Sequence, residues 1–356
     1  VERPNCLGGN CLHTATIPSK TLRETILYIA GVRQRSLYGI QTTLGKHVSI
    51  DDLLRRKDAV IRSQVEVLEN KLDRNGVTLL SGSARFLEPH RVEVVEPDGR
   101  RQEVHAQVIV IATGSKPARD PGIPFDDAQV FDSDAILRLG SIPRSLTIVG
   151  GGVIGCEYAC MFAVLGTRVT LVDTRPRVLD FADREIAELL VARMREHGTT
   201  LRLGEEVAEV RIESPHRVVA ETKSGKLVVS EKLLYAVGRE GNTADLDLAQ
   251  AGLTAARRDL LTVNQHFQTA VPHPCLSIIS PRVSCAFSRK SAFRSPAVIR
   301  ERSYHWLICS TDVRRRISDR LDVVGSVIVT SGDPGDPVPA GRCVHPAAPA
   351  GAPGGS

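Results

Sequence analysis

The sequence predicts an α/β fold built around a parallel sheet. From Leu146 the chain has the pattern of a strand, a glycine-rich turn, a helix and a second strand, and a further helical pattern runs from Asp183 to His197 before Gly198. Upstream, two helical patterns are followed by short runs rich in β-branched residues. Strands and helices that alternate in this way are typical of a parallel sheet with helices packed on its faces.

The two helices near the start of the chain are predicted from apolar spacing. Apolar residues recur at helical intervals after Pro18, so we expect a helix over residues 18–32 with Lys20 in its first turn. A longer amphipathic pattern covers residues 54–72 and stops at Gly76, a residue suited to ending a helix. Both segments are therefore predicted to be helical.

Short strands are expected after these helices. The runs 77–80, 91–95 and 108–111 are rich in β-forming residues, and the last leads directly into Thr113 and Gly114. Past residue 273 the alternation fades, serine and arginine cluster, and glycine, proline and alanine then dominate. Roughly the last 25 residues are expected to be disordered.

Composition excludes several classes of protein. The chain has 356 residues, 42% of them hydrophobic, which is enough for two or three domains. The net charge of +5 is modest and comes largely from an arginine-rich stretch over residues 282–320, so a nucleic-acid partner is not expected. No apolar run approaches the ~18 residues of a membrane span. Eight cysteines without regular spacing, and no visible signal peptide, favour a reduced, cytoplasmic setting.

The strongest local motif is the glycine turn after residue 149. Gly150 permits a tight turn, Gly152 lets a pyrophosphate approach the backbone, and Gly155 lets the following helix pack closely on the strand. Asp173 follows roughly 20 residues later, where a carboxylate binds the ribose hydroxyls of NAD. Arg175 is either a ligand of the 2′-phosphate of NADP or a solvated surface arginine. The motif predicts dinucleotide binding, and the alternative is a turn that serves packing only.

The segment before the first predicted helix contains two cysteines. Cys6 and Cys11 have the C-x4-C spacing of a flavin-linked redox disulfide. However, the second cysteine of flavoprotein disulfide reductases directly precedes Ile-Pro-Ser-Lys, and Thr16 stands at that place here. A hydroxyl cannot form a disulfide, so dithiol chemistry is not expected. His13 has no second histidine or cysteine at a metal-ligand spacing, and no metal site is predicted.

Lys20 and Glu157 are candidates for an ion pair. Glu157 follows the glycine turn and is, in the simplest interpretation, a solvated glutamate in the first turn of its helix. The alternative is that it pairs with Lys20 beside a flavin ring. The ammonium would then favour negative charge on the reduced ring while the carboxylate keeps the lysine oriented.

With these residues, the sequence resembles the soluble pyridine nucleotide transhydrogenases, a branch of the dihydrolipoamide dehydrogenase and glutathione reductase flavoprotein superfamily. The resemblance covers residues 1 to about 273. The most specific matching segments are Cys11–Lys20, Asp132–Asp134, Gly155–Ala159 and Leu234–Thr243.

The resemblance implies two dinucleotide-binding units and a redox activity. It implies an FAD enzyme that passes a hydride from NADPH through the flavin to NAD+, with NAD(H) and NADP(H) as substrates and a homo-oligomeric assembly. It divides the chain into a partial FAD-binding domain (1–120), an NAD(P)-binding domain (121–240), a segment that returns to the FAD domain (241–273) and a divergent, disordered tail (274–356).

The resemblance also implies roles for individual residues. The predicted FAD contacts are Glu2, on the adenosine ribose, the loop Gly8, Gly9 and Cys11, and the returning Thr113 and Gly114. Lys20 and Glu157 would form the catalytic pair beside flavin N5. The nicotinamide nucleotide would be held by Gly150, Gly152, Gly155, Asp173 and Arg175, with Gly238 closing that domain.

The sequence departs from the family pattern at both ends. We expect the first Rossmann βα unit of the FAD domain and the C-terminal interface domain to be missing, and the Val-Gly-Asp that follows residue 273 in the family is replaced. A frameshifted or fused reading frame after His273 is one hypothesis for this change. An alternative function is therefore an inactive fragment that retains only NAD(P) binding.

Overall fold

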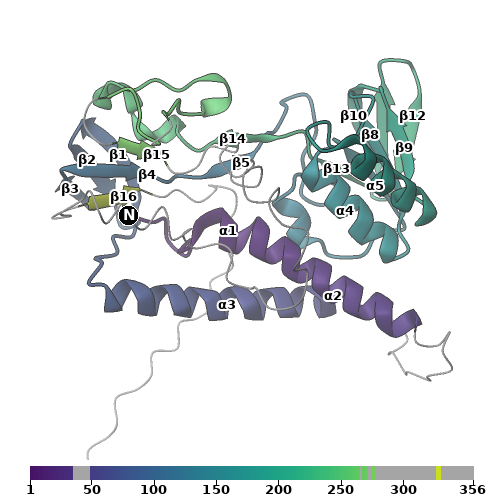
Figure 1. Cartoon of the computed structure of the whole chain (residues 1–356), viewed down its shortest axis with the longest axis horizontal. Coiled ribbons are helices and arrows are strands. Elements are labelled where there is room, and N and C mark those ends of the chain that lie inside the picture. The colour runs from purple at the N-terminus through teal and green to yellow at the C-terminus, as the bar shows by residue number, and fades with distance from the viewer. Residues whose placement is uncertain (35–48, 265–266, 272–274, 278–325, 330–356) are drawn as a thin grey trace, which may run out of the picture.

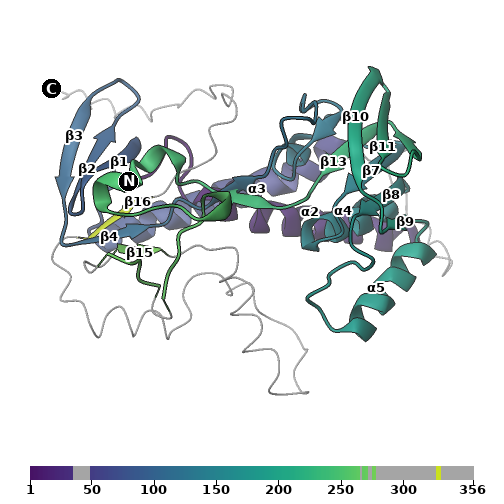
Figure 2. The same ribbon diagram turned by 90° about the horizontal axis from the view of Figure 1, so that it is seen from above.

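The computed structural model describes residues 1–34, 49–264, 267–271, 275–277 and 326–329. These residues form two lobes joined by a narrow ribbon, with two long helices running along one side of both lobes (Figure 1). Figure 2 shows the same arrangement from above. The first lobe contains the start of the chain, and the second contains the glycine turn.

Three helices open the chain: α1 (Gly9–His13), α2 (Thr16–Gln34) and α3 (Ile50–Arg74). The structure confirms both long helices predicted from apolar spacing. α3 begins with a capping box, in which the Ser49 hydroxyl accepts from the Asp52 amide and the Asp52 carboxylate accepts from the Ser49 amide. The helix ends at Arg74, and Gly76 follows its C-cap residue with a φ of 63°, which suits glycine.

The first lobe contains two small sheets. An antiparallel sheet has the order β1 (Ser83–Glu88), β2 (Arg91–Val95) and β3 (Arg101–His105). In the other sheet, β4 (Val108–Ile111) pairs in parallel with β15 (Cys275–Ser277) on one edge and β16 (Ser326–Val329) on the other. The strands predicted at 91–95 and 108–111 are confirmed with the same bounds.

Two expectations for this lobe are wrong. Residues 77–80 are not a strand, because the adjacent chain forms only one bridge, between Glu2 and Ser81, and Val77 and Leu79 are exposed. The expected disorder of residues 274–356 does not hold for β15 and β16, whose backbones complete hydrogen bonds that the edges of β4 would otherwise leave open. The rest of that predicted tail lies outside the described residues.

The second lobe is built on the predicted parallel sheet. Its strand order is β6 (Val130–Phe131), β13 (Lys232–Tyr235), β7 (Ser145–Val149), β8 (Arg168–Asp173) and β9 (Thr200–Leu203), and every pair is parallel. Helices α4 (Val153–Val164) and α5 (Arg184–Glu196) follow β7 and β8. An antiparallel sheet of β10 (Val207–Ser214), β11 (Arg217–Thr222) and β12 (Leu227–Ser230) completes the lobe. The helix predicted at 183–197 is confirmed as α5, which Asp183 caps.

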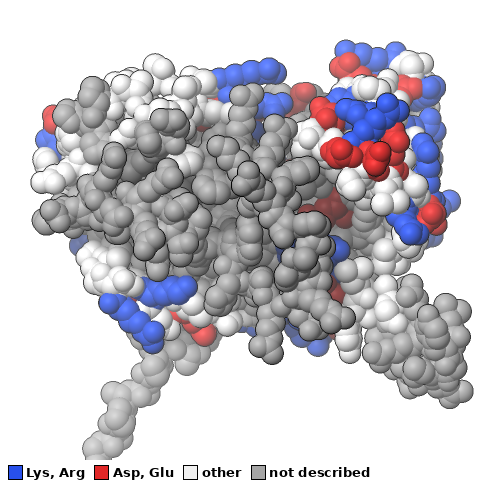
Figure 3. Space-filling view, in the orientation of Figure 1, with Lys and Arg blue, Asp and Glu red and all other residues white. Residues whose placement is uncertain are grey.

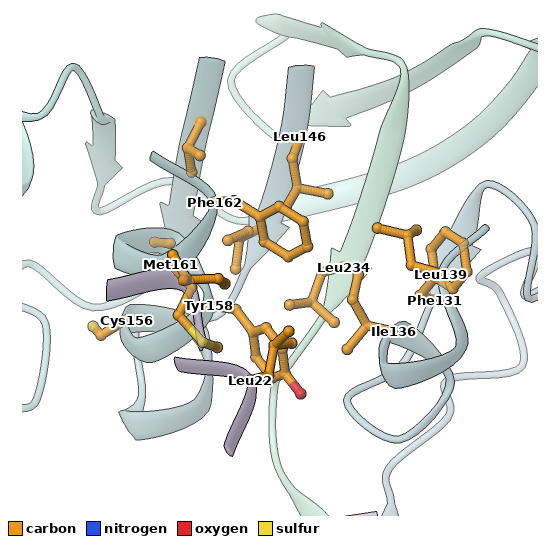
Figure 4. Close-up of a cluster of buried hydrophobic side chains, with 14 of the residues drawn as sticks. Leu22, Phe131, Ile136, Leu139, Leu146, Cys156, Tyr158, Met161, Phe162 and Leu234 are labelled. Carbon is orange, nitrogen blue, oxygen red and sulfur yellow. The ribbon is translucent and has the colours of Figure 1, made fainter. Parts of the chain in front are cut away.

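The largest hydrophobic core joins the long helices to the second lobe. Leu22 of α2 is buried in one cluster with Leu146 of β7 and with Tyr158 and Phe162 of α4 (Figure 4). Leu53 of α3 is fully buried in the same cluster. The apolar faces of α2 and α3 therefore hold the start of the chain against the nucleotide lobe.

A two-stranded antiparallel ribbon connects the lobes. It pairs β5 (Ser115–Pro117) with β14 (Arg239–Gly241), and β14 runs from the second lobe toward the first in Figure 1. Short 3-10 turns lie at 135–138, 244–246, 248–251 and 257–259. The ribbon carries the chain out of the first lobe after Gly114 and back into it after Gly238.

Candidate functional site

The glycine turn between β7 and α4 is tight at two positions and open at a third. Gly150 has a φ of 113°, and a Cβ atom there would overlap the carbonyl oxygen of Ala236. A Cβ atom at Gly155 would overlap the carbonyl oxygen of Gly150, so α4 can approach β7 only without a side chain. Gly152 caps α4 and has no heavy atom within 4 Å of its Cβ position. Space is thus left at the helix N-terminus, where a phosphate is favoured.

Asp173 ends β8 beside this turn, and its carboxylate is fully engaged. Oδ1 accepts from the Arg175 amide at 2.7 Å and from Arg175 Nε at 2.9 Å. Oδ2 accepts from Arg175 Nη2 at 2.7 Å and from the Gly151 amide. Burial would raise the pKa of Asp173, but the hydrogen bonds from the Arg175 side chain and the two amides outweigh it and hold the pKa below its ordinary value. Arg175 is therefore not the freely solvated arginine that the sequence left open.

Lys20 and Glu157 are brought together across the α2–α4 contact. Lys20 Nζ lies 2.5 Å from Glu157 Oε1, although 137 residues separate them in the chain. α4 begins at Val153, so Glu157 lies in its second turn, and the first-turn interpretation is wrong. The lysine side chain is 53% exposed and that of Glu157 only 17%. The pair therefore has its cation at the surface and its carboxylate against the protein.

The opening segment contains no disulfide. Cys6 and Cys11 are both free, and burial raises the pKa of Cys11, which disfavours its thiolate. The expectation that residues 8–11 form a loop is wrong. Gly8, with a φ of 93°, caps α1, so residues 9–13 are helical. His13 ends this helix with its Nε2 3.0 Å from the Leu7 carbonyl oxygen.

The other predicted FAD contacts lie in the first lobe and at its exit into the ribbon. Glu2 is buried, and its amide donates to the Leu80 carbonyl oxygen at 2.9 Å. Thr113 is buried, and its carbonyl oxygen accepts from Asn242 Nδ2 at 3.2 Å. Gly114 has a φ of 73°, and its carbonyl oxygen accepts from the Asn242 amide at 3.1 Å. Asn242, the residue directly after β14, therefore fixes the turn that contains Thr113 and Gly114.

A buried network centred on Arg239, next to Gly238, is not predicted by the sequence motifs. Arg239 Nη1 lies 2.8 Å from Asp134 Oδ1, while Nε donates to Ser115 Oγ at 2.9 Å and Nη2 to the Ser115 carbonyl oxygen at 2.6 Å. The same carbonyl oxygen accepts from Asn10 Nδ2. One arginine thus ties the ribbon to the second lobe. The matching segments contain Asp134 and Arg239, but nothing in their spacing indicated that they meet.

The surface of the second lobe carries charges of both signs. On the face seen in Figure 3, its basic and acidic side chains are interspersed. None of the helices in the described part of the chain is long and apolar enough to cross a membrane. Within the described ranges, no group of three or more His, Cys, Asp and Glu residues is placed to hold a metal ion.

A parallel sheet with a glycine turn after one strand, and an acidic residue at the end of the next, defines a dinucleotide-binding α/β protein. The family model described as "Pyridine nucleotide-disulphide oxidoreductase" matches residues 1–273. The chain belongs to this family.

Relatives and solved structures agree with this assignment. The chain is 46% identical over 275 residues to the soluble pyridine nucleotide transhydrogenase of Mycobacterium bovis, with 77% of this chain and 58% of the relative covered. Identity to the enzyme of that name from Colwellia psychrerythraea is 41% over 271 residues, covering 76% and 58%. The chain thus spans under two thirds of the length of these relatives.

Two solved structures have a similar fold. The crystal structure of LpdA from Mycobacterium tuberculosis matches with a TM-score of 0.71 at 24% identity, covering 78% of this chain and 60% of that one. The HOCl-induced flavoprotein disulfide reductase RclA from Escherichia coli matches with a TM-score of 0.64 at 26% identity, covering 77% and 58%. LpdA, at this identity, shows the fold alone.

Proposed function

We propose that the chain acts as a soluble-type NAD(P)+ transhydrogenase that uses FAD to pass a hydride from NADPH to NAD+. The observation that carries this proposal is the 2.5 Å contact between Lys20 and Glu157. It joins the helix that follows the opening segment to the helix that follows the glycine turn. A flavin and a nicotinamide would have to meet at such a junction between two nucleotide-binding units.

The residues present fit a dinucleotide on each side of that junction. Gly9 and Gly152 have no heavy atom within 4 Å of their Cβ positions, so backbone can approach a ligand closely at both. Glu2, Thr113 and Gly114 would hold the FAD. When bound, FAD supplies the redox chemistry, since flavins accept and donate hydride.

The side chains of Lys20 and Glu157 would position a positive charge at the site and so polarise the bound cofactor. Glu157 would keep the Lys20 ammonium directed at the site, where its positive charge favours negative charge on the reduced cofactor. Thr16, the first residue of α2, supplies a hydroxyl where a dithiol enzyme needs a thiol, which favours nucleotide-to-nucleotide transfer over disulfide reduction. The proposal includes a cytoplasmic setting, a homo-oligomeric assembly, and neither a nucleic-acid nor a membrane partner.

The test is anaerobic reduction of the purified full chain. We expect a yellow protein whose visible flavin band is bleached by NADPH and restored by NAD+. Lys20→Ala should slow bleaching by about 10- to 100-fold, because it removes one charge that stabilises the reduced state. Lys223→Ala, which removes an exposed lysine that pairs with Glu206, is the matched control and should leave the rate unchanged.

Two results would contradict the proposal. A colourless protein that still binds NADH or NADPH would support the alternative of a fragment that only binds nucleotide. A yellow protein in which Lys20→Ala and Lys223→Ala reduce at the wild-type rate would remove the role of the ion pair.

A further inference from the structure

The acidic residue expected to bind the ribose of NAD has no acceptor left for it. A carboxylate offers about four lone-pair sites. Asp173 already accepts four hydrogen bonds: from the Gly151 amide, and from the amide, Nε and Nη2 of Arg175. Its side chain is 4% exposed, so water does not compete for these sites. A ribose hydroxyl can therefore reach Asp173 only after a present donor has left.

The donor able to leave is the Arg175 side chain. The two amides belong to the backbone at the end of β8 and in the glycine turn, and they are fixed by the fold. The Arg175 side chain is 38% exposed, and its Nη1 already contacts Asp180 Oδ1 at 3.0 Å. Asp180 is itself half-exposed and thus offers the guanidinium a second anchor beside the first.

We propose that Arg175 is a specificity-determining latch, which occupies the acceptors of Asp173 and so closes its ribose site against NAD(H), and which binds the 2′-phosphate of NADP(H) while it stays beside the carboxylate. This inference rests on the proposed function, because it assumes that the turn binds both nucleotides. The latch adds a competition between the protein's own arginine and the ligand, which the separate roles of Asp173 and Arg175 do not contain.

The number of bonds exchanged fits this competition. When the guanidinium leaves, two acceptor sites open, those now taken by Nε and Nη2. The adenosine ribose of NAD presents two hydroxyl donors, so the opened carboxylate can be satisfied again. Neutral donors replace charged ones in this exchange, and charge-assisted hydrogen bonds are the stronger. NAD(H) must therefore displace a better partner than itself.

The 2′-phosphate of NADP(H) changes the electrostatic interactions at this site. It would stand beside a buried carboxylate, and two like charges there repel. The Arg175 guanidinium, placed between the two anions, would neutralise the Asp173 carboxylate and bind the 2′-phosphate. Its fork geometry suits a phosphate. The arginine that blocks NAD(H) is thus the group that makes NADP(H) acceptable at the same position.

The test compares binding of NADH and NADPH to the full chain by isothermal titration calorimetry. With Arg175→Ala, NADPH should bind about 10- to 100-fold more weakly, because a charge-assisted contact is lost. NADH should bind several-fold more tightly, because its competitor is gone. Arg177→Ala is the matched control: this exposed arginine lies two residues away, and within the described residues it donates to the Asp180 carbonyl oxygen, at 3.4 Å. It removes the same charge and should move the two affinities in parallel.

The Asp180→Asn variant provides a second test of the latch in the same binding experiment. It weakens the outer anchor, so the guanidinium should stay on Asp173 and NADH should bind several-fold more weakly, with little change for NADPH. Weaker NADH binding by Arg175→Ala, or equal changes for both nucleotides, would overturn the latch while leaving the proposed function standing. Wild-type chain that binds neither nucleotide would overturn both. Circular dichroism of each variant identifies one that has failed to fold, and Arg175→Lys, which keeps the charge without the fork, then decides by an intermediate NADPH affinity.

Discussion

The Arg239–Asp134 pair should be among the most costly ion pairs in the chain to break. Arg239 is 15% exposed and Asp134 only 6%, so neither charge is well solvated. Burial raises the pKa of Asp134, and the Arg239 guanidinium opposes that rise. Arg239→Gln would leave a buried carboxylate without its cation while keeping a polar side chain with the same aliphatic stem as far as Cγ.

The expected cost follows from this burial. Removing one partner of a buried pair costs about 3–5 kcal/mol. Asp134 can limit that cost by taking up a proton, so we expect a deficit of about 2–4 kcal/mol at pH 7. Without the arginine, the folded-state pKa of Asp134 rises further above its unfolded value. The folded variant then binds more protons than the unfolded chain and gains stability as the pH falls toward 3.8, the ordinary value for aspartate.

Urea denaturation followed by circular dichroism at pH 7 and pH 5 measures both effects. The deficit of Arg239→Gln should be smaller at pH 5 than at pH 7, because the raised pKa of Asp134 lets the folded variant take up a proton first. Combining it with Asp134→Asn should cost less than the two single changes summed, because the second change removes the stranded charge. Arg193→Gln, at an exposed pair with Glu196, is the control and should cost less than about 0.5 kcal/mol. A deficit under about 1 kcal/mol that is equal at both pH values would refute the reasoning.

Single contacts elsewhere give further measurable outcomes. Gly155→Ala sets a methyl group against the Gly150 carbonyl oxygen and should cost about 1–3 kcal/mol in thermal unfolding, while Gly140→Ala, in open space, should not. Asp173→Asn should destabilise the chain at pH 7, by an amount that shrinks as the pH falls through 3.8 and below, because the wild-type carboxylate then loses its pairing; denaturation midpoints from pH 7 to pH 3 test this. Cys6→Ser should leave flavin reduction by NADPH unchanged, and a large loss would restore the disulfide interpretation.

Sequence patterns within a segment predicted the helices and strands whose formation depends on interactions within that segment. Both long helices, the strands at 91–95 and 108–111 and the strand–turn–helix of the second lobe were found from period and capping residues. Residues 77–80 have the composition of a strand, yet they remain unpaired along most of their length. Strand formation needs a neighbour, and the sequence of one segment does not say whether a neighbour is present.

The residues of the candidate site also divide into those that a local motif identifies and those that only the fold brings together. Gly150 and Gly155 are required by backbone geometry within a few residues, so a motif identifies them. Arg239 and Asp134 are 105 residues apart, and only the fold brings them together. Asp173 and Arg175 are two residues apart, yet the motif predicts each only as a ligand contact and does not predict the hydrogen bonds between them. Whether two side chains bind a third molecule or each other depends on rotamers, which spacing does not report.

Two ion pairs that link distant segments, Arg239–Asp134 and Lys20–Glu157, differ in what they do for the protein. Arg239–Asp134 is buried, and breaking it leaves an unsolvated charge, so stability alone is a sufficient reason for it. Lys20–Glu157 has a lysine that is 53% exposed, and an ion pair of that kind contributes about 0–1 kcal/mol. Stability is therefore a weak reason for a 2.5 Å contact between α2 and α4. The packing of Leu22, two residues after Lys20, fixes α2 without it. The exposed pair is thus the one that stability explains least, and the proposed role of the Lys20 cation beside a bound cofactor would account for it.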